Sequence, residues 1–137
     1  MMKQHYMVVD DDATNNMICE FTIKRMDKDA AIKMFAVPED ALAFINEEYS
    51  KTNKALPTVL FLDVNMPTMT GWEFLDAFIQ FDEWVKGQFT IYILSSSIED
   101  FTEEAAIYPF IEGFLSKPLK IANLEGVRKN LPESQLS

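Results

Sequence analysis

The sequence is poor in several residue types, and each shortage narrows the class of protein. Its single cysteine, Cys19, rules out a disulfide within the chain and favours a reducing, cytoplasmic location. No apolar run approaches membrane-spanning length, and residues 1–6 lack the apolar segment of a signal peptide. Basic residues are also scarce, with 12 Lys and Arg against 22 Asp and Glu, a net charge of −10. That charge repels nucleic acid and anionic membranes, so we expect no direct nucleic-acid or membrane binding, and protein partners or cations instead.

Histidine occurs once, at His5, ahead of the first predicted strand, where we expect a solvated side chain. A histidine-phosphotransfer protein needs a histidine on a helix, so this shortage excludes that class. Cys19 falls within the first predicted helix, where packing is the expected role rather than nucleophilic chemistry.

What the sequence does contain is a regular alternation of apolar segments. Short apolar runs at 6–9, 30–35, 59–62, 89–94 and 113–115 predict strands, and each is followed by a helical pattern. Met17, Ile18 and Phe21 form the apolar face predicted for the first helix. Five β-α units in series predict one doubly wound α/β domain with a parallel five-stranded sheet. We expect this domain to occupy residues 1–137, with a core at about 5–131 and a tail at 132–137.

Four of the five predicted strands end in polar residues. Asp10, Asp11 and Asp12 follow the first strand, and Asp63, Ser95 and Lys117 follow the third, fourth and fifth. Each alone has an ordinary explanation as a helix cap, a turn residue or a solvated side chain. Because parallel strands end at one edge of the sheet, where α/β proteins place their ligand sites, the coincidence predicts a single site.

The charges at that edge indicate its chemistry. Clustered carboxylates repel one another, so at least one should have a raised pKa in the absence of a cation. Oxygen ligands of this kind suit Mg²⁺, which keeps waters free for phosphate oxygens. With Lys117 as a point charge and Ser95 as a hydroxyl donor, the set meets the requirements for moving a phosphoryl group onto a carboxylate.

At this point the sequence resembles the receiver domain of two-component response regulators, the CheY-like type. The resemblance covers about residues 5–131. It is carried by VVDD at 8–11, LDVNMP at 62–67 with Gly71, LSS at 94–96, and GFLSKP at 113–118. It implies a flavodoxin-like (βα)5 fold with strand order 2-1-3-4-5.

The resemblance also implies a role for each matching residue. Asp63 would be the phosphoacceptor. Asp11 and Asp63 would bind Mg²⁺ directly, Asp10 through water, and Asn65 through its backbone carbonyl. Lys117 would hold the phosphoryl group, and the bond before Pro118 would be cis.

Signalling would depend on two further residues, Ser95 as the switch hydroxyl and Phe114 as the switch aromatic. The implied function is a stand-alone response regulator, not an enzyme, phosphorylated by a histidine kinase or histidine phosphotransfer protein. A downstream protein would bind the face made by the fourth predicted helix, roughly 99–107, the fifth strand and the fifth helix. Ser97 occupies the position that helps set phosphoryl lifetime in this family, and the fourth helix is short, broken at Tyr108 and Pro109.

Two other interpretations fit part of this pattern. A hydrolase of the haloacid-dehalogenase type also uses a strand-end aspartate with Mg²⁺, but it would need an Asp-x-Asp motif and a cap, whereas Val64 and Asn65 follow Asp63. A degenerate receiver acting only as an interaction module would have lost key positions, which here are intact.

Overall fold

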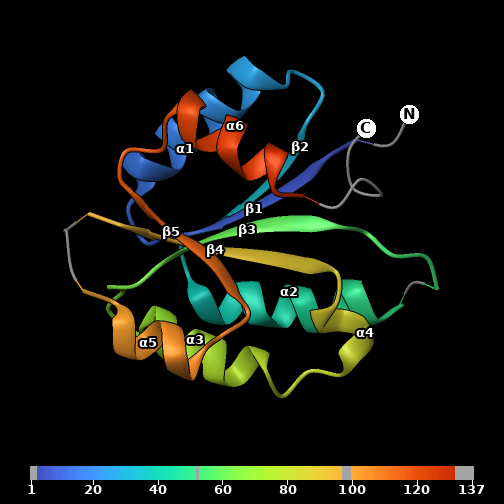
Figure 1. Ribbon diagram of the computed structural model, residues 1–137. Coiled ribbons are helices and arrows are strands. Elements are labelled where there is room, and N and C mark those ends of the chain that lie inside the picture. Colours follow the sequence, from blue (N-terminus) through green and yellow to red (C-terminus); the bar gives the residue numbers. More distant parts are fainter. Residues whose placement is uncertain (1–2, 52, 97–99, 132–137) are drawn as a thin grey trace.

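The computed structural model describes residues 3–51, 53–96 and 100–131. Its strands are β1 (His5–Val9), β2 (Ala31–Phe35), β3 (Thr58–Asp63), β4 (Phe89–Ser95) and β5 (Ile111–Ser116). They form one parallel sheet in the order β2-β1-β3-β4-β5 (Figure 1). The predicted fold and strand order are therefore confirmed.

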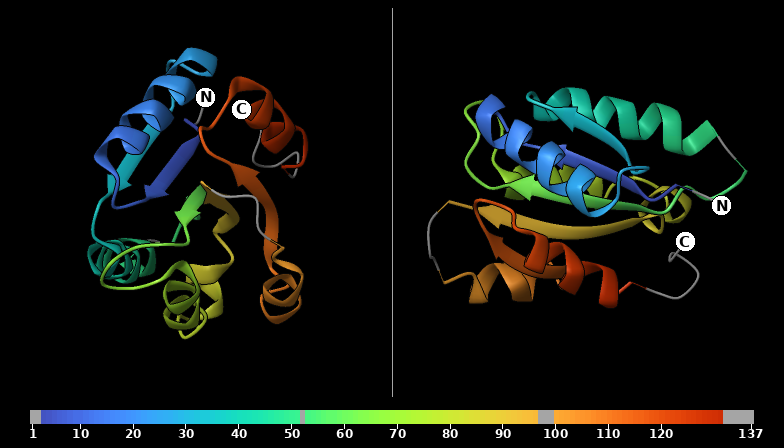
Figure 2. Two further views of the ribbon diagram at one scale, coloured as in Figure 1. Left: turned by 90° about the vertical axis from the view of Figure 1, so that its left-hand side faces the viewer. Right: turned by 90° about the horizontal axis from the view of Figure 1, so that it is seen from above.

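Helices cover both faces of this sheet (Figures 1 and 2). The helices are α1 (Ala13–Met26), α2 (Pro38–Lys51), α3 (Gly71–Phe78), α4 (Glu83–Lys86), α5 (Thr102–Ile107) and α6 (Ile121–Lys129). One face packs against α1 and α6, and the other against α2, α3, α4 and α5. Every residue of the central strand β3 is buried, as expected for an apolar run covered on both sides.

The helix starts follow from local chemistry at the carboxyl ends of the strands. The Asp12 carboxylate accepts the backbone N–H of Thr14 at 2.9 Å, which caps α1 just after β1. The Thr70 side chain accepts the backbone N–H of Glu73, and the Glu73 carboxylate accepts that of Thr70, a capping box that starts α3. Each cap therefore sets the residue at which a helix begins, shortly after the strand end that carries the acidic residues.

The first helix differs from its predicted orientation. Met17 and Phe21 are 69% and 64% exposed, so the apolar face points to solvent instead of the sheet. The buried side is formed mainly by polar and small residues, namely Asn15, Asn16, Cys19, Thr22 and Ile23. Polar groups at the end of β1 explain this rotation, because they require hydrogen-bond partners from the first turn of α1.

Two further helices also depart from the sequence pattern. The four-residue α4, capped by Asp82, was not predicted. The acidic helix expected at about 99–107 is observed at Thr102–Ile107, and Glu99 lies outside the described residues. None of the described helices is long and apolar enough to cross a lipid bilayer.

Candidate functional site

The ends of β1, β3 and β5 bring the predicted acidic residues and Lys117 together. Asp10, Asp11 and Asp63 each offer a carboxylate oxygen, and these oxygens lie within 4.8 Å of one another. Asp10 is 1% and Asp63 is 5% exposed, whereas Asp11 is exposed. A cation reaching this site would therefore meet two buried carboxylates and one that faces solvent.

Lys117 bridges the two buried carboxylates. Its Nζ lies 2.7 Å from Asp10 Oδ2 and 3.1 Å from Asp63 Oδ1. Burial alone would lower the pKa of Lys117, but hydrogen bonds and charge from Asp10 and Asp63 raise it above its usual value. The ammonium group is therefore held in its charged form between the two acids.

The pKa of Asp63 is raised, as predicted for one carboxylate of the cluster, and burial is the larger of the two causes. Burial raises the pKa of Asp63, and the charge of Asp10 raises it further. The ammonium of Lys117 and the backbone N–H of Val64 act in the opposite direction. Lys117 therefore only partly offsets the cost of the buried negative charge, and an added cation would reduce that cost.

Asp10 accepts hydrogen bonds at both carboxylate oxygens from groups that the sequence motifs did not indicate. The backbone N–H of Asp12 donates to Oδ1 at 2.9 Å, and Asn15 Nδ2 donates to Oδ2 at 2.7 Å. Asn16 Nδ2 donates to the Asp10 backbone carbonyl at 2.9 Å. Asn15 is 5% exposed, so this donor is built into the site and holds the carboxylate in one orientation. The sequence signal was a pair of asparagines in the first turn of a helix that begins at the strand end.

Ser95 and Asn65 flank the acidic cluster on neighbouring segments. Ser95 is buried at the end of β4, and its backbone carbonyl accepts the N–H of Lys117 at 2.8 Å. Asn65 follows β3 and its side chain is exposed. The peptide bond between Lys117 and Pro118 is cis. Ser97 lies outside the described residues.

The backbone of the β3–α3 loop closes tightly behind Asp63. The N–H of Gly71 donates to the Val64 carbonyl at 2.8 Å. A Cβ atom at Gly71 would lie 2.6 Å from the Asp63 carbonyl oxygen, which is too close for any side chain without a backbone shift. Glycine at this position therefore allows the loop to approach the strand end.

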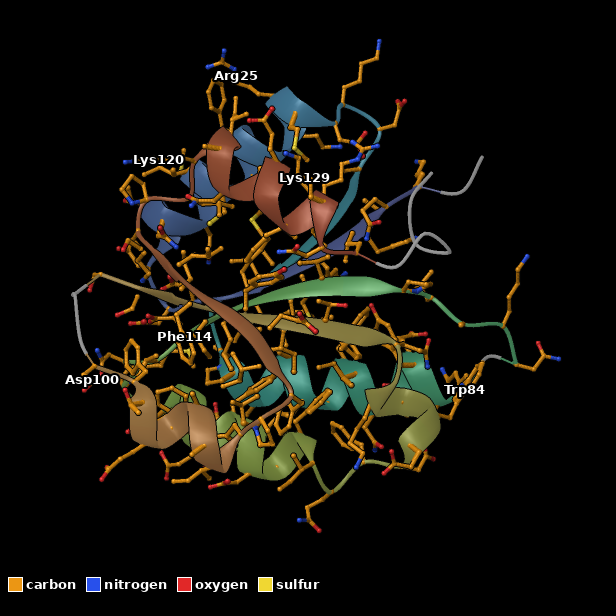
Figure 3. The ribbon with its side chains drawn as sticks, viewed as in Figure 1. Arg25, Trp84, Asp100, Phe114, Lys120 and Lys129 are labelled. Atoms are coloured by element: carbon orange, nitrogen blue, oxygen red, sulfur yellow. The ribbon has the colours of Figure 1, made fainter. Side chains whose placement is uncertain are left out.

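Phe114 lies on β5, on the α5 side of the sheet (Figure 3). It is 37% exposed, and its ring stacks on that of Phe101 with centroids 5.2 Å apart. The ring of Phe101 in turn packs edge-on against that of Trp72, with centroids 5.6 Å apart. The ring is thus partly covered by aromatic neighbours and partly available to a binding partner.

Cys19 has no feature of a reactive thiol. It is fully buried on the inner side of α1, and burial raises the pKa of its thiol to about 12. A thiol in this state carries almost no thiolate at neutral pH, in keeping with the packing role predicted for it.

The described geometry agrees with a family match over most of the chain. Residues 6–127 match the family model of the response regulator receiver domain. The chain therefore belongs to the response regulator receiver family, a class of signalling domains that acts in phosphorelays. No curated protein sequence matches this chain.

Solved structures share the fold at low sequence identity. A two-component response regulator from Cytophaga hutchinsonii superimposes with a TM-score of 0.82 at 24% identity, covering 94% of this chain and 96% of that one. A response regulator receiver protein from Dyadobacter fermentans gives 0.79 at 23% identity, covering 92% and 95%. The chemotaxis protein CheY4 of Vibrio cholerae gives 0.67 at 23% identity, covering 95% and 100%.

Proposed function

We propose that Asp63 accepts a phosphoryl group from a histidine kinase or histidine phosphotransfer protein, with Mg²⁺ bound beside it. The observation that carries this proposal is the position of Lys117, whose ammonium contacts both Asp10 and Asp63 at the buried end of the sheet. A carboxylate nucleophile, a fixed cation and two further carboxylates are the groups that phosphoryl transfer to aspartate requires.

In the proposed step, a carboxylate oxygen of Asp63 attacks the phosphorus atom of the phosphorylated donor histidine. The new O–P bond forms while the N–P bond breaks. The bonding electron pair goes to the leaving ring nitrogen, and the proton already carried by the other ring nitrogen makes the product a neutral imidazole. Lys117 supplies a positive charge to the phosphoryl oxygens at the site where it now contacts Asp63. Bound Mg²⁺ would neutralise further negative charge on the same oxygens.

The carboxylates differ in how they would hold the cation. Asp11 and Asp63 are proposed as direct ligands, together with the backbone carbonyl of Asn65. Asp10 already accepts hydrogen bonds from Asp12, Asn15 and Lys117, which supports a contact through a water molecule instead. All donors are oxygen atoms, the ligand type that Mg²⁺ prefers.

The proposed output uses Ser95 and Phe114. A phosphoryl group on Asp63 offers acceptor oxygens, and the hydroxyl of Ser95 moves toward them from the neighbouring strand end. Phe114 then turns inward and changes the face built from α5, β5 and α6, which a downstream protein reads. The free energy available equals the difference in phosphate contacts between the two states, about 1 to 3 kcal/mol.

Exposed apolar side chains on this face support its role in binding. Ile107 on α5 is 67% exposed, and Phe114 on β5 is 37% exposed. Covering such apolar side chains with a binding partner removes them from water and so favours the complex. On this interpretation the protein is a phosphorylated switch whose only catalysis is of its own phosphorylation and dephosphorylation.

The test is phosphorylation by acetyl phosphate with Mg²⁺, followed by intact mass. Wild type should gain one phosphate, and Asp63→Asn should gain none. Asp76→Asn is the matched control, because Asp76 lies on α3 and bonds the Tyr108 hydroxyl outside the cluster. Normal labelling of Asp63→Asn would refute the assignment.

The output is tested separately, by binding to the downstream partner with and without beryllofluoride, a phosphate mimic. Ser95→Ala should still be phosphorylated but should lose the dependence of partner binding on beryllofluoride. Phe114→Ala should change binding without blocking phosphorylation. If both variants respond as wild type does, the signal leaves by another route.

A further inference from the structure

A cavity of about 700 Å³ lies at the amino edge of the sheet, the edge opposite the acidic cluster. Its walls come from the starts of β1 and β2, the second half of α2, and the segment before β3. This is the edge at which the described chain begins in Figure 1. His5 lines the cavity and Asp10 follows the same strand, so the two sites are about 16 Å apart along β1.

Hydrogen bonds hold the apolar wall of this cavity in place. The ring of Tyr49 packs edge-on against Phe44 with centroids 6.3 Å apart, and its hydroxyl bonds Thr58 Oγ1 at 2.7 Å. Gln88 Nε2 donates to the Tyr49 carbonyl at 3.2 Å, and Gln88 Oε1 accepts the N–H of Leu56 at 2.9 Å. Tyr49 and Leu56, which both line the cavity, are therefore fixed by one buried side chain. A pre-formed apolar wall is typical of small-molecule sites.

The rim of the cavity is positively charged, in contrast to the chain as a whole. Lys3, Lys33 and Lys54 line it and are exposed, and among the described residues that line it Glu48 is the one carboxylate. The Lys33 ammonium lies 5.0 Å from the centroid of the Phe44 ring. The cationic rim and the aromatic wall are therefore adjacent, and a ligand can contact both at once.

We infer that this cavity binds a small aromatic carboxylate, a function separate from phosphoryl transfer at Asp63. The aromatic body would pack on the partly exposed ring of Phe44, which the buried ring of Tyr49 supports from behind, and the carboxylate would face the ammonium of Lys33 and its basic neighbours. Its volume lies within the range of about 300 to 1,000 Å³ usual for small-molecule pockets. The neutral apolar wall and the charged rim together select an amphipathic anion over a purely polar one.

His5 offers a built-in reporter of occupancy. It was expected to be solvated, but its side chain is half-buried, and burial followed by the charge of Lys3 lowers its pKa. The charged groups that share the cavity with it are Lys3, Lys33, Lys54 and Glu48, with the Tyr49 phenol. An added carboxylate among them would favour protonated His5 and raise its pKa. As the only histidine in the chain, it gives a single set of imidazole signals.

The experiment is an NMR titration of the wild-type protein with 2-naphthoate, monitored at the His5 imidazole and the backbone amides. We expect saturable shifts at His5 and at the cavity walls, with a higher His5 pKa in the bound state. The neutral analogue 2-naphthamide should bind more weakly. Lys33→Glu should weaken 2-naphthoate binding about fivefold to tenfold, because it reverses one charge at the rim.

Two control variants and one further test variant distinguish binding in the cavity from nonspecific attraction. Lys129→Glu makes the same charge reversal on α6, across the sheet from α2 (Figure 3), and should leave the affinity unchanged. Asp63→Asn should also bind 2-naphthoate as wild type does, which keeps this test independent of the proposed phosphorylation. Phe44→Leu keeps an apolar side chain but removes the aromatic contact, and should weaken binding.

The proposal is overturned if His5 does not shift, or if acid and amide bind equally. It is also overturned if Lys33→Glu and Lys129→Glu weaken binding to the same extent, which would indicate attraction to overall charge only. Unfolding curves of the variants serve as a check that each remains folded.

Discussion

The two edges of the sheet are formed by the same strands but carry different chemistry. At the carboxyl edge, the carboxylates of Asp10, Asp11 and Asp63 lie together, and the Lys117 ammonium contacts the two buried ones, Asp10 and Asp63. At the amino edge, Lys3 and Lys33 are exposed around an apolar cavity. The first edge is thus a tightly bonded polar site, and the second is a hydrophobic surface with a charged rim.

This difference follows from how each edge is assembled. Residues at the carboxyl edge follow the strands directly in the sequence, so the strand register alone brings them together. The amino edge is completed by Phe44 and Tyr49 from the second half of α2, whose position depends on packing. Substitutions at the carboxyl edge should therefore have large effects on stability and chemistry, and substitutions at the amino edge small ones.

The largest effect on the free energy of unfolding is expected from Gly71→Ala. The new Cβ would lie 2.6 Å from the Asp63 carbonyl oxygen, so the backbone behind the phosphoacceptor must move. We expect a loss of about 2 to 3 kcal/mol in the free energy of unfolding, typical of overpacking at a buried position. Phosphorylation by acetyl phosphate should fall as well.

Gly126→Ala is the matched control for that change. Gly126 lies in α6, where an added Cβ meets nothing within 4 Å. Alanine in a helix should stabilise the protein by about 0.5 to 1 kcal/mol. Urea unfolding of both variants checks the pair, and equal effects at the two glycines would contradict the close packing at Gly71.

The second effect concerns Asn15, which orients Asp10. Asn15→Leu removes the donor to Asp10 Oδ2 and leaves a buried carboxylate with fewer partners. We expect a loss of about 1 to 2 kcal/mol in unfolding free energy. Because Asn15 supports a proposed metal ligand, Mg²⁺ affinity should also fall about tenfold.

Mg²⁺ affinity can be measured from the rise of the melting temperature with Mg²⁺ concentration. Met17→Leu, on the exposed side of the same helix, is the control and should change neither the unfolding free energy nor the Mg²⁺ affinity. If Asn15→Leu binds Mg²⁺ as tightly as wild type, Asn15 has only a packing role.

These two predictions separate what the sequence reveals from what it does not. Strand ends can be located from apolar runs, and so the sequence alone places Asp63, Ser95 and Lys117 correctly at the carboxyl edge. Asn15 could not be found in this way, because the apolar spacing of Met17, Ile18 and Phe21 indicated the wrong buried face for α1. Polar hydrogen bonding to the end of β1 decided the rotation of this helix, and hydrophobic periodicity does not report such bonds.

At the amino edge, too, the sequence pattern did not predict which side chains are buried. His5 is half-buried and not solvated as predicted, because its burial depends on residues that are not its neighbours in sequence. The residues that cover it lie on α2, β2 and the segment before β3, far away along the chain. The four-residue α4 was missed for a related reason, since its length is too short for a periodic pattern.

The third prediction concerns the pH dependence of stability at the carboxyl edge. The folded pKa of Asp63 is raised above its ordinary value of 3.8, so the folded state binds this proton more tightly than the unfolded state does. The contribution of Asp63 to stability is therefore fully present below that ordinary value and is lost as pH rises through the raised pKa. Asp63→Asn removes this penalty and should therefore raise the unfolding free energy at pH 7 in EDTA.

The gain should disappear in acid, where Asp63 is protonated in both states. Glu125→Gln removes one negative charge from the exposed side of α6 and is the control for net charge. An equal gain from Glu125→Gln would mean that general repulsion within this acidic chain, and not burial of Asp63, limits stability.

The smallest effect is expected at the amino edge, from Lys33→Ala. Lys33 and Lys117 are both lysines held near a partner, but Lys117 contacts two buried carboxylates and Lys33 is exposed beside the Phe44 ring. An exposed contact between an ammonium and an aromatic ring contributes about 0.5 to 1 kcal/mol, so loss of Lys33 should lower the unfolding free energy by no more than this. Because Lys33 lies in the middle of β2, and β1 separates that strand from β3 with Asp63, Asp63 should be phosphorylated by acetyl phosphate at the wild-type rate. Urea unfolding and intact mass on one preparation measure both quantities. A clear loss of phosphorylation in Lys33→Ala would show that the two edges are coupled through the sheet, and the separation of their functions would then be wrong.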